Sequence, residues 1–267
     1  MKHPVTLLLL SLFAAPVLGA DAPATKPVRI ILVGDSTMAT RTGYGDALCA
    51  RFTPDVTCIN LARGGRSSGS FRAEGRWDEV EALLKDNASF SASYVLVQFG
   101  HNDQPGKPGR STDLVTQFPQ NIERYALEVS ALGGVPVLVT PLTRRIFKGA
   151  YVRDDLAPWA AATRRVAQQR KVALIDLNRI SAAAIQAMGP QEADTLAQAP
   201  KPAALPPTQP TASTEPQGAP KSAFDYTHVG AKGAAVFSGM VAAELERLFP
   251  GLKQSLGSPS MRTASQP

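Results

Sequence analysis

Two segments that lie far apart in the chain carry the residues of a catalytic pair. Ser36 lies in the segment GDST (34–37), directly after an apolar run, and His228 ends the segment DYTH (225–228). Asp225 stands three residues before His228, where its carboxylate can accept the Nδ1 proton and orient the ring. Nε2 is then free to take a proton from a serine hydroxyl. The pattern predicts acyl transfer with Ser36 as nucleophile, His228 as base and Asp225 as its orienting acid.

Two further segments offer hydrogen-bond donors for the oxyanion of a tetrahedral intermediate. Gly65 lies in the segment NLARGGRSS (60–68), and without a side chain its N–H can come close to a substrate oxygen. Asn102, in the segment GHND (100–103), offers a side-chain amide. With the N–H of Ser36 these groups would form an oxyanion hole, in which one donor contributes roughly 3–4 kcal/mol to transition-state stabilisation.

The glycine-rich segment also contains a rival nucleophile. Residues 65–69 read GRSSG, which fits the G-x-S-x-G pattern of the α/β-hydrolase nucleophile elbow with Ser67 as the serine. No HGGG-like segment precedes it, and few residues lie upstream to form the strands that this fold requires first. Ser36 is therefore the favoured nucleophile, and comparison of Ser36→Ala with Ser67→Ala would decide between them.

The chain has only three histidines, His3, His101 and His228. We interpret His101 as a structural or substrate-side residue, because no carboxylate is placed for it as Asp225 is for His228. A metal site at His101 and Asp103 is disfavoured because few other ligands are available.

Other charged residues near these segments have two readings each. Asp35 is expected to stabilise the turn that holds the nucleophile, with a role as acid or base as the alternative. Arginine suits bidentate recognition of carboxylates, so Arg66, Arg144 and Arg145 are candidates for substrate contacts. Ordinary surface charge is the alternative for each of the three arginines.

Five short runs of apolar and β-branched residues must position these groups. They span residues 28–33, 56–61, 94–99, 135–140 and 172–177. Helical periodicity lies between most of them, and helices are predicted around 119–132, 157–169 and 237–248. Strands that are apolar on both faces and alternate with helices indicate an α/β fold with a five-stranded parallel sheet. Ligands bind at the carboxyl ends of such strands, where the segments above begin.

The first twenty residues read as a secretory signal peptide. Lys2 is followed by an apolar run and then by small residues, and the run is short for a membrane span of roughly 20 residues. The mature protein is therefore expected to be secreted or periplasmic, without stable membrane insertion, and a membrane anchor is the alternative for this run. In an oxidising compartment Cys49 and Cys58 are expected to pair, with two buried free thiols as the alternative.

The rest of the chain reads as one domain, residues 27–250, with two segments outside its core. Residues 189–222 are rich in Pro, Ala, Gln and Thr and are expected to form a flexible insertion without helix or strand. Residues 251–267 are expected to be a disordered tail.

The formal net charge is +6, but the basic residues are scattered and the single RGG is no repeat, so no nucleic-acid partner is expected. We expect a monomer.

Four segments together resemble the SGNH (GDSL) hydrolase superfamily, and within it the rhamnogalacturonan acetylesterase family. They are GDST (34–37), NLARGGRS (60–67), FGHND (99–103) and DYTH (225–228), and the similarity runs from 28 to 248 apart from the insertion. Thr37 replaces the leucine of the superfamily's name, a change that the pectin-acting branch shares. The resemblance implies a three-layer flavodoxin-like fold and a serine esterase that needs no metal or cofactor.

The resemblance further implies that the protein removes acetyl groups from a pectic polysaccharide through an acetyl-Ser36 intermediate. Xylan, peptidoglycan or a short-chain acyl ester are alternative substrates. A catalytically inactive carbohydrate-binding protein is a further alternative, but it would typically have lost Ser36, Asn102 or His228, and all three are present.

Overall fold

The computed structural model describes residues 26–201 and 224–257. Its centre is a parallel sheet in the order β2-β1-β3-β4-β7, which confirms the predicted fold class. The five strands are β1 (Val28–Gly34), β2 (Val56–Asn60), β3 (Ala92–Gln98), β4 (Val135–Val139) and β7 (Ala173–Ile175).

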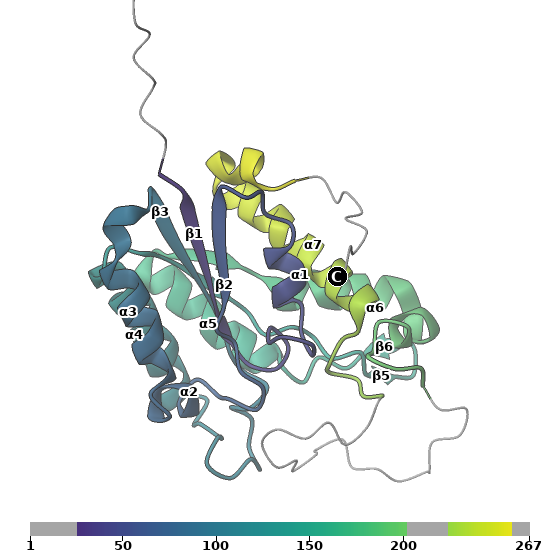
Figure 1. Ribbon diagram of the computed structural model, residues 1–267. Helices are drawn as coiled ribbons and strands as arrows, with labels where there is room; N and C mark the ends of the chain where they lie inside the picture. The colour runs from purple at the N-terminus through teal and green to yellow at the C-terminus, as the bar shows by residue number, and fades with distance from the viewer. Residues whose placement is uncertain (1–25, 202–223, 258–267) are drawn as a thin grey trace, which may run out of the picture.

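Helices cover both faces of this sheet, so that the molecule has three layers (Figure 1). One face is covered by α1 (Gly45–Cys49), α6 (Leu177–Asp194) and α7 (Ala231–Leu248). The other is covered by α3 (Arg76–Lys85), α4 (Gln117–Ala131) and α5 (Ala157–Arg170). The remaining short elements are α2 (Ser70–Ala73), the 3-10 helices η1 (Asn87–Ser89) and η2 (Pro250–Ser255), and a hairpin of β5 (Phe147–Lys148) and β6 (Tyr151–Val152).

Strand β1 shows why its sequence is apolar on both sides. Ile30 and Leu32 lie in the core beneath α1, α6 and α7, while Ile31 and Val33 lie in the core beneath α3, α4 and α5. Successive side chains of a strand point to opposite faces, so a central strand between two helical layers needs apolar residues at every position.

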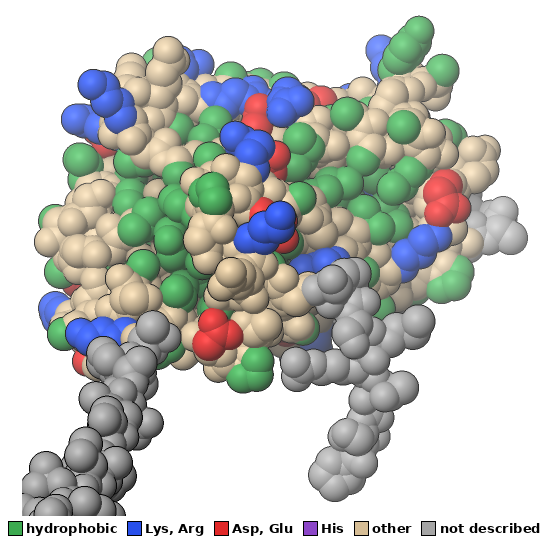
Figure 2. Space-filling model, turned by 90° about the horizontal axis from the view of Figure 1, so that it is seen from above, with side chains coloured by type: hydrophobic (Ala, Val, Ile, Leu, Met, Phe, Trp, Pro, Cys, Tyr) green, Lys and Arg blue, Asp and Glu red, His purple; other side chains and the backbone are tan. Residues whose placement is uncertain are grey.

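The pairing register brings the loops after β1, β2 and β3 to one edge. Leu32 is paired with Asn60, and Gly34 with Gln98. The segments that start with Asp35, Leu61 and Phe99 therefore leave the sheet side by side. At the opposite end of the molecule, the described residues show no histidine side chain, and their basic and acidic side chains are interspersed with hydrophobic and uncharged ones (Figure 2).

The expectation that no helix forms beyond residue 189 is wrong for the start of that segment. Helix α6 continues to Asp194 across a kink at Gly189, whose φ of 74° is left-handed. Glycine adopts this conformation without strain, and Pro190 then begins a second helical run, a position that tolerates a missing N–H. Leu196 is fully buried, and its carbonyl accepts the N–H of Gly230. The other insertion residues, 202–222, lie outside the described part.

The expectation of a disordered tail from residue 251 is also wrong for its first residues. Leu252 and Leu256 are buried, and Leu256 forms a β-bridge with Phe52. Residues 258–267 and the predicted signal peptide lie outside the described residues.

Cys49 and Cys58 form a disulfide, as expected, which ties α1 to the edge strand β2. Among the described helices, none has the length and apolarity that a membrane span requires.

Candidate active site

Ser36 stands on a tight turn directly after β1, and Asp35 holds that turn as expected. Asp35 Oδ1 accepts the N–H of Thr37 at 2.9 Å and its hydroxyl at 2.7 Å, and the carbonyl of Asp35 accepts the N–H groups of Met38 and Ala39. Burial opposes ionisation of Asp35, but His101 and the Thr37 donors hold its pKa below the ordinary value. The nucleophile candidate is thus fixed by a buried, ionised carboxylate.

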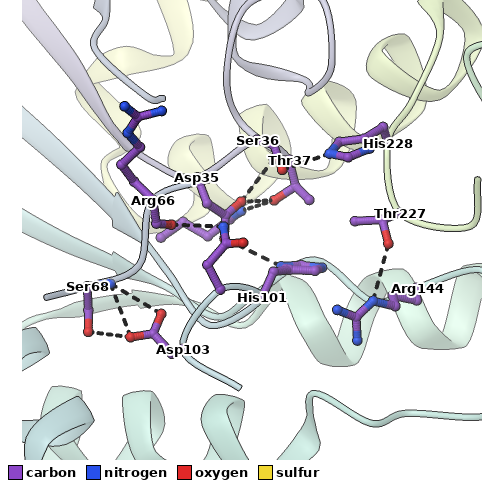
Figure 3. A network of polar contacts seen from close by, with 12 residues as sticks. Asp35, Ser36, Thr37, Arg66, Ser68, His101, Asp103, Arg144, Thr227 and His228 are labelled. Atoms are coloured by element: carbon purple, nitrogen blue, oxygen red, sulfur yellow. Dashed lines mark hydrogen bonds and ion pairs between the residues drawn. The ribbon is translucent and has the colours of Figure 1, made fainter. Parts of the chain in front are cut away.

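The structure brings Ser36, His228 and Asp225 together as the sequence predicts. His228 Nε2 lies 2.8 Å from Ser36 Oγ, and Nδ1 lies 2.7 Å from Asp225 Oδ2. Figure 3 shows the ring of His228 pointing toward Ser36. Burial opposes the charge of Asp225, but His228 and the N–H groups of Thr227 and His228 hold the pKa of this carboxyl below its ordinary value. Asp225 is therefore an anion that can orient the ring and stabilise its protonated form.

Arg145 fixes the segment that carries the histidine, a role that the sequence did not reveal. Its guanidinium donates to the carbonyls of Asp225 at 2.6 Å and His228 at 2.8 Å, and its backbone N–H donates to the carbonyl of Tyr226. Arg145 is 1% exposed. The interpretation of Arg145 as a contact for substrate carboxylates is therefore wrong. Its place just after β4 was the one signal that it belongs to the site.

The predicted oxyanion donors lie at the same edge of the sheet. Within the described residues, the N–H groups of Ser36 and Gly65 have no hydrogen-bond acceptor. Gly65 has a φ of 77°, which glycine adopts without strain. Asn102 donates one N–H to the carbonyl of Arg66 at 3.0 Å, which leaves the second N–H of its amide available.

A buried carboxylate links the second and third loops behind these donors. Asp103 Oδ1 accepts the hydroxyl of Ser68 at 2.6 Å and that of Thr112 at 2.9 Å, and the N–H of Ser68 also points to this carboxylate. Burial raises the pKa of Asp103 to about 6, although these donors favour its charge. The link holds Asn102 and Gly65 in register with each other.

The structure also bears on three alternatives that the sequence left open, namely Ser67 as the nucleophile, the role of His101 and a metal site. Ser67 is fully buried, and its hydroxyl is bonded to Ser70, so it is not presented as a nucleophile. His101 is buried with Nδ1 3.5 Å from Asp35 Oδ2, and burial lowers its pKa despite that carboxylate, so it is a structural residue. No group of three or more potential metal-ligating side chains occurs in the described ranges.

Taken together, the arrangement can transfer an acyl group. A serine hydroxyl faces an imidazole, and the imidazole faces a carboxylate. Backbone N–H donors that have no acceptor among the described residues lie at the same edge of the sheet. Such donors stabilise the negative charge that develops on a carbonyl oxygen under attack.

Comparison with known proteins agrees with this chemistry. The model of the GDSL-like Lipase/Acylhydrolase family matches residues 32–236. Rhamnogalacturonan acetylesterase RhgT of Bacillus subtilis (strain 168) is 31% identical over 241 residues, which cover 87% of this chain and 96% of that protein. The probable rhamnogalacturonan acetylesterase YesY of the same organism is 28% identical over 85% of this chain and 96% of its own length.

Solved structures share the fold. YxiM from Bacillus subtilis superposes with a TM-score of 0.63 at 22% identity over 84% of this chain, which spans 57% of that longer chain. The acetylxylan esterase Axe2 from Geobacillus stearothermophilus superposes with a TM-score of 0.54 at 15% identity, over 82% of this chain and 92% of that one.

Proposed function

The chain belongs to the GDSL-like lipase/acylhydrolase family, and we propose that it is an exported esterase that removes O-acetyl groups from a pectic polysaccharide of the rhamnogalacturonan type. Two relatives aligned over most of the chain carry this activity in their names. The export part rests on the signal-like sequence of residues 1–20 and on the Cys49–Cys58 bridge, since disulfides persist in oxidising compartments.

The observation that carries the proposal is the contact chain from Ser36 Oγ to His228 Nε2 at 2.8 Å and from Nδ1 to Asp225 Oδ2 at 2.7 Å. In the first step, Ser36 Oγ attacks the acetyl carbonyl carbon while His228 Nε2 takes the hydroxyl proton. The oxyanion receives hydrogen bonds from the N–H groups of Ser36 and Gly65 and from the Asn102 amide. Collapse of the tetrahedral intermediate breaks the bond to the sugar oxygen, which takes the proton from His228.

The second step returns the enzyme to its starting state. Water attacks the acetyl group on Ser36 while His228 Nε2 again takes a proton, and the same donors hold the second oxyanion. Breakage of the bond to Ser36 Oγ releases acetate, and His228 returns the proton to the serine. Asp225 remains ionised throughout and stabilises the imidazolium in both steps.

Acetate release from a panel of acetylated glycans tests this function. The panel contains rhamnogalacturonan, homogalacturonan, xylan and peptidoglycan, each incubated with the unaltered protein and with Ser36→Ala. We expect the highest kcat/KM on rhamnogalacturonan and no release above background with Ser36→Ala. Release from xylan or peptidoglycan alone would reject the pectic substrate and keep the esterase. Absence of release from every polymer and from p-nitrophenyl acetate would reject the esterase itself.

A further inference from the structure

One residue of the loop 40–44, between the turn after β1 and α1, contacts both halves of the catalytic pair. Thr42 Oγ1 donates to the carbonyl of Ser36 at 2.7 Å. The carbonyl of Thr42 accepts the N–H of Val229 at 3.0 Å, and Val229 directly follows His228. We call residues 225–229 the base segment. Thr42 thus joins the nucleophile to this segment, although Ser36 and His228 lie 192 positions apart in the chain.

The hydroxyl of Thr42 completes the support of the peptide group that follows the nucleophile. The N–H of this group belongs to Thr37 and donates to Asp35 Oδ1 at 2.9 Å. Its carbonyl belongs to Ser36 and accepts the hydroxyl of Thr42. Among the described residues, no backbone N–H donates to this carbonyl. Removal of the hydroxyl would therefore release one side of the peptide group that sets the backbone orientation at Ser36.

The chain that follows α6 holds both partners of this link. The carbonyl of Leu196 accepts the N–H of Gly230, the residue after the base segment, at 3.0 Å. Gln198 Nε2 donates to the carbonyl of Arg41 at 2.7 Å, and Arg41 directly precedes Thr42. The loop 40–44 and the base segment are therefore fixed to the same support, and Thr42 lies where they meet.

The loop 40–44 adopts a conformation that its own sequence does not favour. Arg41 has a φ of 69°, in the left-handed region that is uncommon for a residue with a side chain. Gly43 lies so close to the turn after β1 that a Cβ atom there would collide with the carbonyl of Thr37. Backbone strain persists only where surrounding contacts determine the conformation, and it is concentrated at functional sites. The strain here lies directly before Thr42, which points to a function for the position of that residue.

We propose that Thr42 is a positioning residue for acyl transfer, which holds Ser36 Oγ within reach of His228 Nε2 by binding the backbones of both segments. This inference rests on the proposed esterase function and adds a residue to it. Proton transfer from Ser36 to His228 requires a separation of about 2.6–3.2 Å between the two atoms, and the observed distance is 2.8 Å. A small displacement of either backbone would lengthen this contact, while Thr42 itself takes no proton and touches no reacting atom.

Thr42→Val tests the hydroxyl, because valine is similar in shape and cannot donate to the Ser36 carbonyl. We expect kcat for p-nitrophenyl acetate to fall by about 10- to 100-fold per folded molecule, with KM changed by less than about twofold, as displacement of a reacting group does. Thr42→Ser keeps the hydroxyl and should restore most of kcat. Thr40→Val is the matched control and should leave kcat unchanged, since this exposed threonine of the same loop donates to Asp46.

Covalent modification by phenylmethylsulfonyl fluoride separates positioning from stability. Ser36 Oγ displaces fluoride from the sulfur atom while His228 takes the hydroxyl proton, so this reaction uses the same pair without a glycan. Urea unfolding gives the fraction of folded molecules in each variant. We expect the modification rate of folded Thr42→Val to fall by a factor similar to that of kcat, whereas a residue that only stabilises the fold would leave this rate unchanged. If Thr42→Val does not fold, Thr42→Ala is compared with Thr42→Ser in the same way.

The outcomes separate this inference from the function on which it rests. Unchanged kcat and modification rate in the folded valine or alanine variant would overturn the positioning role, while hydrolysis by the unaltered protein would still support the esterase. An equal loss in Thr42→Ser would also overturn it, because the hydroxyl would then not be the group that acts. Absence of p-nitrophenyl acetate hydrolysis by the unaltered protein would overturn the proposed function and this inference together.

Discussion

Asp225 binds two sets of donors with its two oxygens, and Asp225→Asn separates them. Oδ1 accepts the N–H groups of Thr227 and His228 at 2.6 Å each, while Oδ2 faces His228 Nδ1 at 2.7 Å. An asparagine can keep its oxygen on the two N–H groups, which turns its NH2 toward Nδ1. The neutral ring must then accept at Nδ1 and carry its proton on Nε2, the atom that has to deprotonate Ser36.

The size of the effect follows from this exchange of tautomers. The equivalent substitution in a serine protease triad lowers kcat about 10⁴-fold, which corresponds to about 5 kcal/mol of activation free energy. The fold should be affected far less, because the two backbone hydrogen bonds and the Arg145 contacts to the segment remain. Weaker, uncharged hydrogen bonds should lower the free energy of unfolding by about 1–2 kcal/mol.

Hydrolysis of p-nitrophenyl acetate at neutral pH measures kcat, and urea unfolding of the same samples measures stability. Asp78→Asn is the matched control, since Asp78 is an exposed acid in the first turn of α3. A kcat for Asp225→Asn within tenfold of the unaltered enzyme would refute the orientation of His228 by this carboxylate. Loss of both activity and folding would show instead that the two backbone bonds of Oδ1 dominate.

Two further predictions concern the oxyanion donors and the disulfide. Asn102→Ala should lower kcat for p-nitrophenyl acetate by about 10²–10³, the typical cost of one oxyanion donor, with a smaller change in KM. Replacement of Cys49 and Cys58 by serine should lower the free energy of unfolding in urea by about 2–3 kcal/mol, because the bridge closes a short loop.

The sequence predicted most of the fold because the sheet leaves a strong local signal. A strand such as β1 is buried on both faces, so its apolar run is continuous and differs from any surface segment. The candidate site was predictable for a related reason. The groups concerned follow strand ends directly, and the three-residue spacing of Asp225 and His228 is a local relation.

Contacts that depend on the path of a loop were not predictable. The bonds of Arg145 to carbonyls some 80 positions away arise only once the segments after β4 and before α7 meet. Composition likewise misrepresented residues 189–201, because Gly189 allows a kink after which a helix begins again and Leu196 reaches the core. Proline content describes the average of a segment and does not mark the residue where packing resumes.

The central claim is that Ser36 is the nucleophile of an ester hydrolase, and parallel measurement of kcat/KM for p-nitrophenyl acetate in Ser36→Ala and Ser67→Ala tests it most directly. The account predicts a loss of roughly a thousandfold or more for Ser36→Ala. It predicts that folded Ser67→Ala stays active, because Ser67 is buried and bonded to Ser70. Retention of activity in Ser36→Ala with loss in folded Ser67→Ala would contradict it.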